Sequence, residues 1–88
     1  MIFITLGRFR KKPTKAMIAE SSKLMEQGLK EAGGKILGWY WTLGRYDAVA
    51  IFEAPNEKEA MKMAVRRADF LDLETMVAIP AEEARKLI

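Results

Sequence analysis

The side chains best suited to ligand chemistry lie in one short stretch, residues 38–52, which contains both tryptophans and both tyrosines of the chain. Asp47 is the strongest candidate, because a carboxylate near the mouth of a cavity can hold a ligand amine or act as a base. The alternative, which we favour, is that Asp47 lies one residue past a turn and bonds backbone amides or Thr42. In that role it stabilises a hairpin.

The aromatic residues around Asp47 also allow two interpretations. Trp39, Tyr40 and Trp41 can line an apolar ligand cavity, but we favour positions in the core and at a subunit interface. Tyr46 can donate a hydrogen bond to a ligand, although a strand-end tyrosine anchored at an interface is the preferred interpretation. The ligand-binding candidates are therefore Tyr40, Trp41, Thr42, Tyr46 and Asp47.

The chain contains no cysteine and no histidine. Without cysteine, disulfides and thiolate metal sites are excluded. Without histidine, the chain lacks the commonest general base near neutral pH and the commonest metal ligand. Gly33 and Gly34 follow a helix instead of opening one, so they do not form a phosphate loop, and no carboxylates cluster with the spacing of a magnesium site. We therefore predict no catalytic residue, no metal ligand and no cofactor.

Length and composition indicate one globular domain spanning residues 1–88, with half of the residues apolar and 31% charged. A domain of this size buries only about 60–65% of its unfolded surface, so oligomerisation commonly supplies missing stability. The apolar residues 1–6 are too few to span a membrane and do not resemble a signal peptide. We expect a soluble cytoplasmic protein. Gln27 and Asn56 are the only amide side chains, which fits a thermophilic source.

The net charge of +3 originates in one basic segment, residues 8–15. It holds Arg8, Arg10, Lys11, Lys12 and Lys15 with no acid between them. Such a segment can attract nucleic acid, but no nucleic-acid-binding motif accompanies it and we favour a solvated loop. Arg66 and Arg67 are expected on an exposed helix face. Asp72 and Glu74 share one strand face, where they can serve acid–base chemistry or, as we prefer, discourage edge pairing.

Apolar periodicity and turn signals predict the order strand, helix, strand, strand, helix, strand. The first helix follows Thr14 and ends at Gly33, the second follows Asn56, and residues 81–87 form a short closing helix. This order predicts an α+β, ferredoxin-like βαββαβ fold, with a four-stranded antiparallel sheet and two helices on one face. The strands are expected at residues 2–9, 35–43, 46–54 and 71–79.

Residue spacing also predicts the buried face of each helix, because positions three and four apart lie on the same side. The predicted stripe of the first helix consists of Ile18, Ser22, Met25, Leu29 and Ala32. The predicted stripe of the second consists of Ala60, Met61, Ala64, Val65 and Ala68.

Gly44 and Arg45 are expected to form a two-residue type II′ turn between the second and third strands. This turn predicts the opposed pairs Trp41–Ala48, Trp39–Ala50 and Leu37–Phe52 on one face, and Tyr40–Val49, Gly38–Ile51 and Thr42–Asp47 on the other. Both faces are substantially apolar, whereas two helices cover only one. Exposed apolar surfaces of this size usually mark a partner, so we expect the uncovered face to pack against a second copy.

The motif Gly44-Arg45-Tyr46-Asp47, preceded by Trp-Thr-Leu and followed by an alternating apolar strand, resembles that of the GYD domain family. Residues 4–9, 33–35 and 53–55 also fit that family, so the resemblance covers nearly the whole chain. The basic residues 10–15 are not typical of it. The family is similar to the dimeric α/β barrel superfamily, in which two ferredoxin-like subunits pack sheet to sheet and enclose a cavity.

The resemblance implies a fold and no single reaction. The superfamily includes cofactor-free monooxygenases, lactone isomerases, haem-degrading enzymes and effector domains of leucine-responsive regulators. In those regulators a similar hairpin lies near the small-ligand site. Our leading hypothesis is a non-enzymatic module that forms a homodimer or higher homo-oligomer and binds a small ligand in or near the barrel.

Two alternatives remain. The first is a cofactor-free enzyme, monooxygenase- or isomerase-like, that acts on a small apolar substrate with Tyr40, Trp41 and Asp47 lining the site. The second is weak nucleic-acid binding through residues 8–15.

Overall fold

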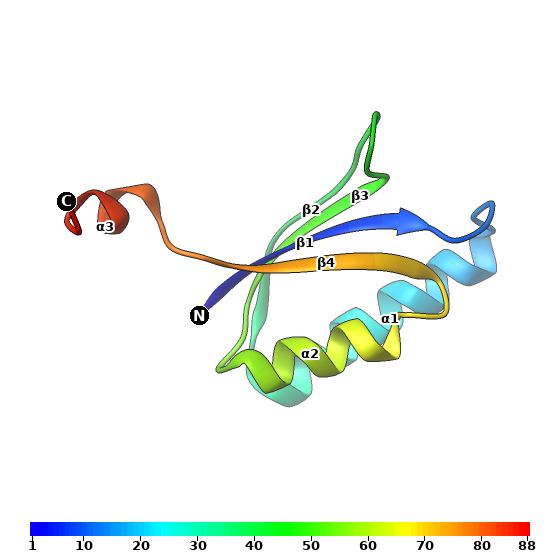
Figure 1. The fold of residues 1–88 in the computed structure, drawn as a ribbon. Coiled ribbons are helices and arrows are strands. Elements are labelled where there is room, and N and C mark those ends of the chain that lie inside the picture. The colour runs from blue at the N-terminus through cyan, green and yellow to red at the C-terminus, as the bar shows by residue number, and fades with distance from the viewer.

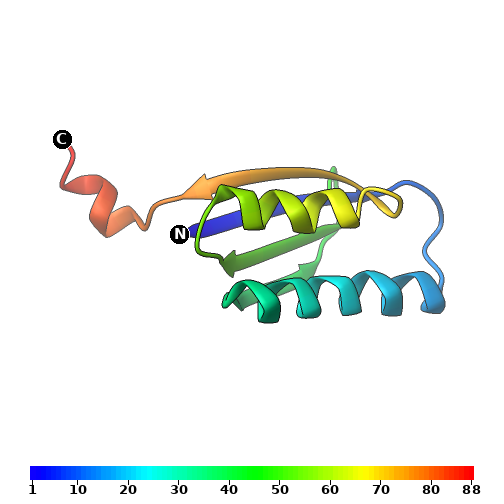
Figure 2. The ribbon, with the colours of Figure 1, turned by 90° about the horizontal axis from the view of Figure 1, so that it is seen from below.

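The computed structural model describes all residues from Met1 to Ile88. Its elements are β1 (Ile2–Phe9), α1 (Lys15–Ala32), β2 (Lys35–Trp41), β3 (Ala48–Glu53), α2 (Glu57–Arg66), β4 (Leu71–Ala78) and α3 (Ala81–Arg85). The four strands form one antiparallel sheet in the order β2-β3-β1-β4. Helices α1 and α2 lie side by side against one face of this sheet (Figures 1 and 2). The predicted α+β ferredoxin-like fold is confirmed.

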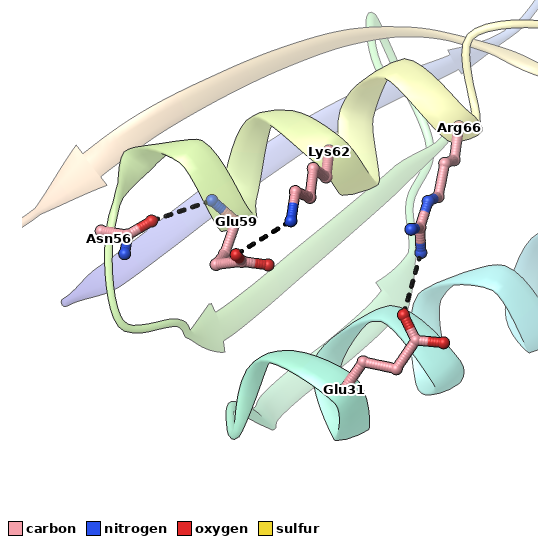
Figure 3. Close-up of polar contacts among 5 residues, drawn as sticks. All are labelled: Glu31, Asn56, Glu59, Lys62 and Arg66. Atoms are coloured by element: carbon pink, nitrogen blue, oxygen red, sulfur yellow. Dashed lines mark hydrogen bonds and ion pairs between the residues drawn. The ribbon is translucent and has the colours of Figure 1, made fainter.

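Both long helices begin at the predicted capping residues. The Thr14 hydroxyl accepts a hydrogen bond from the backbone N–H of Met17 at 3.1 Å. The Asn56 side chain accepts one from the N–H of Glu59 at 3.0 Å (Figure 3). These bonds satisfy amides that have no partner within the helix. Helix α1 ends at Gly33, whose φ of 75° is the left-handed conformation that glycine adopts without strain.

The core lies between the two helices and the covered face of the sheet. Its largest members are Phe3 of β1, Phe52 of β3 and Met25 of α1, each 2% exposed or less. The rings of Phe3 and Phe52 stack with their centroids 5.5 Å apart. Trp39 is partly buried against this cluster. The hairpin face that meets the helices is therefore the one with Trp39, Ala50 and Phe52.

The predicted stripe of α1 was partly wrong. Met25 and Leu29 are buried as expected, but the other buried positions are Ser21 and Gly28 rather than Ser22 and Ala32. The small residues at 21 and 28 face α2. A Cβ atom on Gly28 would lie only 2.9 Å from Cγ of Met63, so the two helices approach too closely for a larger residue.

The predicted stripe of α2 was also wrong in part. Its buried residues are Ala60 and Met63, whereas Met61 and Val65 are 66% and 69% exposed. Arg67, at the end of this helix, was expected on the surface but is only 5% exposed. The buried line therefore runs through residues 60, 63 and 67. Apolar residues occur on both sides of α2, so spacing alone could not identify the covered side.

The hairpin keeps most of the predicted register. Trp41 pairs with Ala48, Tyr40 with Val49, Trp39 with Ala50 and Gly38 with Ile51. The expected Leu37–Phe52 pair was wrong, because a bulge between Ile36 and Gly38 places Ile36 opposite Phe52. The bulge leaves Leu37 46% exposed.

The turn of the hairpin is wider than a two-residue loop. Strand β2 ends at Trp41 and β3 begins at Ala48. The last backbone hydrogen bond before the turn is donated by the Thr42 N–H to the carbonyl oxygen of Asp47, at 2.8 Å. No bond joins Leu43 and Tyr46, so the expected type II′ turn was wrong. Gly44 still has the positive φ, 97°, for which a glycine was expected.

The remaining face of the sheet carries no helix (Figure 1). Helix α3 does not cover it, since it extends beyond the end of β4 (Figures 1 and 2) and buries none of its residues. None of the helices combines the length and the apolar composition that crossing a membrane requires.

Candidate functional site

The face of the sheet without helices, termed the open face, has an apolar centre. Strand alternation places Ile4 and Leu6 of β1 beside Val49 and Ile51 of the neighbouring β3. Tyr40 of β2 and Met76 of β4 extend this surface toward both edges, and they are 58% and 46% exposed. The ring of Tyr40 lies over Gly38, where a Cβ atom would come within 2.8 Å of it. The open face is thus a continuous apolar surface four strands wide.

Asp47 joins the hairpin to the end of β1. Its carboxylate oxygen Oδ2 accepts a hydrogen bond from the backbone N–H of Phe9 at 2.9 Å, and its own N–H donates to the carbonyl of Gly7 at 2.8 Å. Within the turn, the Thr42 hydroxyl donates to the carbonyl of Tyr46 at 2.6 Å. Thr42 and Asp47 therefore hold the backbone of the hairpin in place, as the favoured interpretation of Asp47 required.

A polar cluster borders the open face beside this hairpin. The Tyr46 hydroxyl donates to Oε2 of Glu74 at 2.6 Å, and the guanidinium of Arg8 lies 5.4 Å from the centre of the Tyr46 ring. The hydrogen bond to Glu74 is the main cause that raises the pKa of Tyr46 above its ordinary value of 10.0. Nearby, Arg10 and Asp72 form an exposed ion pair at 2.9 Å. Two cations of the basic segment, Arg8 and Arg10, therefore have contacts within the chain, and so do both carboxylates on this face of β4, Asp72 and Glu74.

The five predicted ligand-binding residues are not brought together around one cavity. Tyr40 and the Tyr46 hydroxyl lie on the open face, whereas Trp41 lies on the side that faces the helices, where its ring meets Phe9 edge to face at 5.2 Å. Neighbouring residues of a strand point to opposite faces. Within one chain, Tyr40 and Trp41 therefore cannot line the same pocket, as the cofactor-free enzyme would require.

A second site, which we call the Arg67 cavity, lies on the helix side of the sheet. It has a volume of about 290 Å³, is partly open to solvent, and is lined by residues of α1, the end of α2 and the strands around Trp39 and Trp41. Arg67 contributes the only charged side chain of its lining. Nε of Arg67 donates to the Ser21 hydroxyl at 3.1 Å, and Nη1 lies 3.5 Å from the sulfur of Met25.

Arg67 is a buried cation without an acidic partner. None of the four ion pairs in the structure includes it, and its guanidinium lies 6.0 Å from the centre of the Trp39 ring. Burial lowers the pKa of Arg67 below its ordinary value, because a low-dielectric environment disfavours the charged form. The spacing of Ala60, Met63 and Arg67 was the sequence signal for this position. We missed it because an arginine is rarely buried.

The two regions present different chemical groups. No group of three or more acidic side chains is placed to hold a metal ion. The open face offers apolar area with a tyrosine and charged groups at its border, and the Arg67 cavity offers aromatic rings, hydroxyls and one cation.

Comparisons with known proteins place the chain in a family and a fold. The family model for the GYD domain matches residues 3–88. A search of curated proteins gave no match. Among solved structures, FFRP-DM1 is 18% identical, with a TM-score of 0.61, and the alignment covers 89% of this chain and 97% of that one.

Two further structures have the same fold. The hypothetical protein PHS023 from Pyrococcus horikoshii is 17% identical, with 90% of each chain covered and a TM-score of 0.57. Muconolactone isomerase is 17% identical, with 91% of this chain and 92% of that one covered and a TM-score of 0.51. Both are dimeric α/β barrel proteins. This chain therefore belongs to the GYD domain family, and it has the ferredoxin-like fold found in the dimeric α/β barrels.

Proposed function

We propose that the protein functions as a homodimer in which two open faces pack together and enclose a space for a small ligand. The observation that carries this proposal is the uncovered apolar centre of the sheet, formed by Ile4, Leu6, Val49, Ile51, Tyr40 and Met76. Removing such a surface from water is favourable roughly in proportion to its area. A second copy supplies a surface of the same kind.

The border of the open face supports the same arrangement. Stable interfaces combine an apolar centre with a polar rim. Here the apolar centre is bordered by Arg8, Tyr46 and Glu74 next to the hairpin, and by the Arg10–Asp72 ion pair. Both signs of charge are present at this border. Two copies related by a twofold axis can therefore place opposite charges across the interface.

The ligand part of the proposal rests on Tyr40 and Tyr46. Both belong to the open face and have polar hydroxyls, and Tyr46 is already oriented by Glu74 at 2.6 Å. A small, mostly apolar molecule enclosed between two sheets would contact these rings. Thr42 and Asp47 would act indirectly by positioning Tyr46 in the turn.

Two variants test the dimer: one places a carboxylate on the open face, and the other places it on the helical side of the chain. Ile51→Glu introduces a carboxylate at the centre of the open face, and Val65→Glu introduces the same group on α2, where the side chain is 69% exposed. Burying an unpaired carboxylate costs several kcal/mol, so Ile51→Glu should weaken the dimer at least a hundredfold. Val65→Glu should leave it intact.

Sedimentation velocity over a range of concentrations measures both variants. The wild-type protein and Val65→Glu should sediment as dimers, while Ile51→Glu should sediment as a folded monomer with an unchanged circular dichroism spectrum. A wild-type protein that stays monomeric at micromolar concentration would rule the proposal out. So would equal dimerisation of both variants.

The ligand part has a separate test. A thermal-shift screen of small apolar compounds should give hits that raise the melting temperature of the wild-type protein. These hits should perturb the NMR signals of Tyr40 and Tyr46. A screen without hits, on a protein shown to be dimeric, would leave the dimer standing and refute the ligand.

A further inference from the structure

We infer that the Arg67 cavity is a binding site for a small aromatic monocarboxylic acid, whose carboxylate pairs with the Arg67 guanidinium and whose ring contacts Trp39 and Trp41. The site lies on the side of the sheet opposite the open face. It is therefore independent of the proposed dimer, and it belongs to a single subunit.

The first argument is the unpaired charge. A buried charge is costly unless it has a partner of opposite sign and a full set of hydrogen bonds. Arg67 has neither a carboxylate partner nor strong acceptors beyond the Ser21 hydroxyl, because the sulfur of Met25 is a weak one.

The second argument is that donors remain free on the cavity side. The guanidinium has five N–H groups, and Nη2 makes no hydrogen bond within the protein. No fully buried side-chain nitrogen lacks a partner, so Nη2 must be accessible, and the Arg67 cavity is the space that this residue lines. The paired N–H groups of arginine match the two oxygens of a carboxylate.

The third argument is the rest of the lining. Phe9, Trp39 and Trp41 present aromatic rings, and Ser22 adds a hydroxyl beside that of Ser21. Because the lining contains one cation and no acid, it matches a ligand that carries a single negative charge. A phosphate dianion would bring an excess charge into an apolar space. The volume of about 290 Å³ is close to the lower end of ligand cavities, roughly 300 Å³, which favours a molecule with a single ring.

The surroundings of the cavity favour the entry of an anion. Trp41 is 62% exposed and also lines a neighbouring hollow that contains Pro13 and Lys15. Lys15, from the basic segment, is the only charged residue that lines this hollow, so one positive charge lies beside the cavity. Exposed charges of this kind raise the local concentration of an anionic ligand at low ionic strength.

The probe for this site is sodium benzoate, compared with benzamide, its neutral isostere, with inorganic phosphate and with sodium chloride at equal ionic strength. The two tryptophans give two indole N–H signals in a ¹⁵N–¹H spectrum, and both side chains line the cavity. Benzoate should shift both signals along saturable curves. The other three solutes should not. Absence of saturable shifts with benzoate would overturn the inference, as would equal binding of benzamide or of phosphate.

Variants assign the site to Arg67. Arg67→Met removes the charge and keeps an apolar side chain of similar length, so benzoate affinity should fall tenfold or more, on the scale of a charge-assisted hydrogen bond. Arg66→Met is the matched control. Arg66 is the preceding residue, but it does not line the cavity, and its guanidinium reaches across to Glu31 of α1 at 3.5 Å (Figure 3), so this variant should bind benzoate as the wild type does.

Two further measurements separate loss of the binding site from loss of the fold. Replacing an unpaired buried charge by an apolar residue is often neutral or stabilising, so Arg67→Met should resist urea at least as well as the wild type. Ser22→Leu leaves Arg67 in place but fills the cavity from α1, and it should also abolish the benzoate shifts. Benzoate binding that persists in folded Arg67→Met or in Ser22→Leu would refute the site.

Discussion

The carboxylate of Asp47 accepts a hydrogen bond from the backbone N–H of Phe9 at 2.9 Å, across 38 residues of sequence. This bond links the β2–β3 hairpin to the end of β1. It also positions the segment that carries Tyr46, whose hydroxyl reaches Glu74 on β4 at 2.6 Å. The aspartate of the family motif therefore has a structural role that can be measured.

Replacing Asp47 by alanine should destabilise the fold. The variant leaves the Phe9 N–H without its acceptor, and hydrogen bonds to charged groups contribute about 1.5–3 kcal/mol. We expect the free energy of unfolding to fall by roughly that amount in urea titrations. Asp47→Asn should lose less, because the amide oxygen can still accept the bond. Asp69→Ala, at an exposed aspartate that accepts no side-chain hydrogen bond, is the control, and an equal loss in both alanine variants would refute the role of Asp47.

The two glycines after α1 should respond very differently to alanine. A Cβ atom on Gly34 would collide with the backbone carbonyl oxygen of Glu53, whereas one on Gly33 would meet nothing within 4 Å. Gly33→Ala should therefore lower the free energy of unfolding only by the cost of a left-handed backbone conformation, about 1–2 kcal/mol. Gly34→Ala should cost about 3 kcal/mol or more, as overpacking does when the neighbour is rigid. Thermal or urea unfolding measures the difference, and an equal effect would contradict the packing described here.

Tyr46 should titrate at a higher pH than an ordinary tyrosine. Its hydrogen bond to Glu74 favours the neutral phenol and raises the pKa above 10.0 in the folded state. The resulting stabilisation is fully present below the unfolded pKa, about 10, and is lost as the pH rises through the folded pKa. The ¹³Cζ chemical shift of Tyr46 follows this titration.

Glu74→Gln removes the charged acceptor and should lower the pKa of Tyr46 toward 10.0. Glu82→Gln is the matched control, because Glu82 lies in α3, none of whose residues is buried. If Glu74→Gln left the titration of Tyr46 unchanged, the contact between these side chains would be absent in solution.

Much of the fold could be predicted from local signals. Thr14 and Asn56 cap the helices as expected, and Gly33 ends α1. The match of each large tryptophan, Trp39 and Trp41, with a small alanine on the opposite strand predicted most of the hairpin register. These features depend on residues close in sequence. The wide turn could not be predicted from the hairpin alone, because Asp47 at its end also contacts β1, where its N–H donates to Gly7. The bulge at Leu37 lies in the pairing of β2 with β3, and no spacing of residues in β2 indicated it.

The candidate site was only partly predictable for a similar reason. The aromatic hairpin was evident, and so was the excess of apolar surface. The burial of Arg67 depends on how closely α1 approaches α2, which is set by Ser21 and Gly28 facing Met63 and Arg67. The spacing of Ala60, Met63 and Arg67 is a signal within α2, but Met61 and Val65 give a competing apolar side, and only the contacts with α1 decide between the two.

The central claim is that a second copy covers the open face, and an isotope-filtered NOE experiment tests it most directly. A mixed sample of ¹³C-labelled and unlabelled protein reports only contacts between subunits. We predict intersubunit NOEs at the methyl groups of Ile4, Leu6, Val49 and Ile51, and none at Val65 on α2. Intersubunit NOEs confined to the helices, or a complete absence of such NOEs at millimolar concentration, would contradict the account.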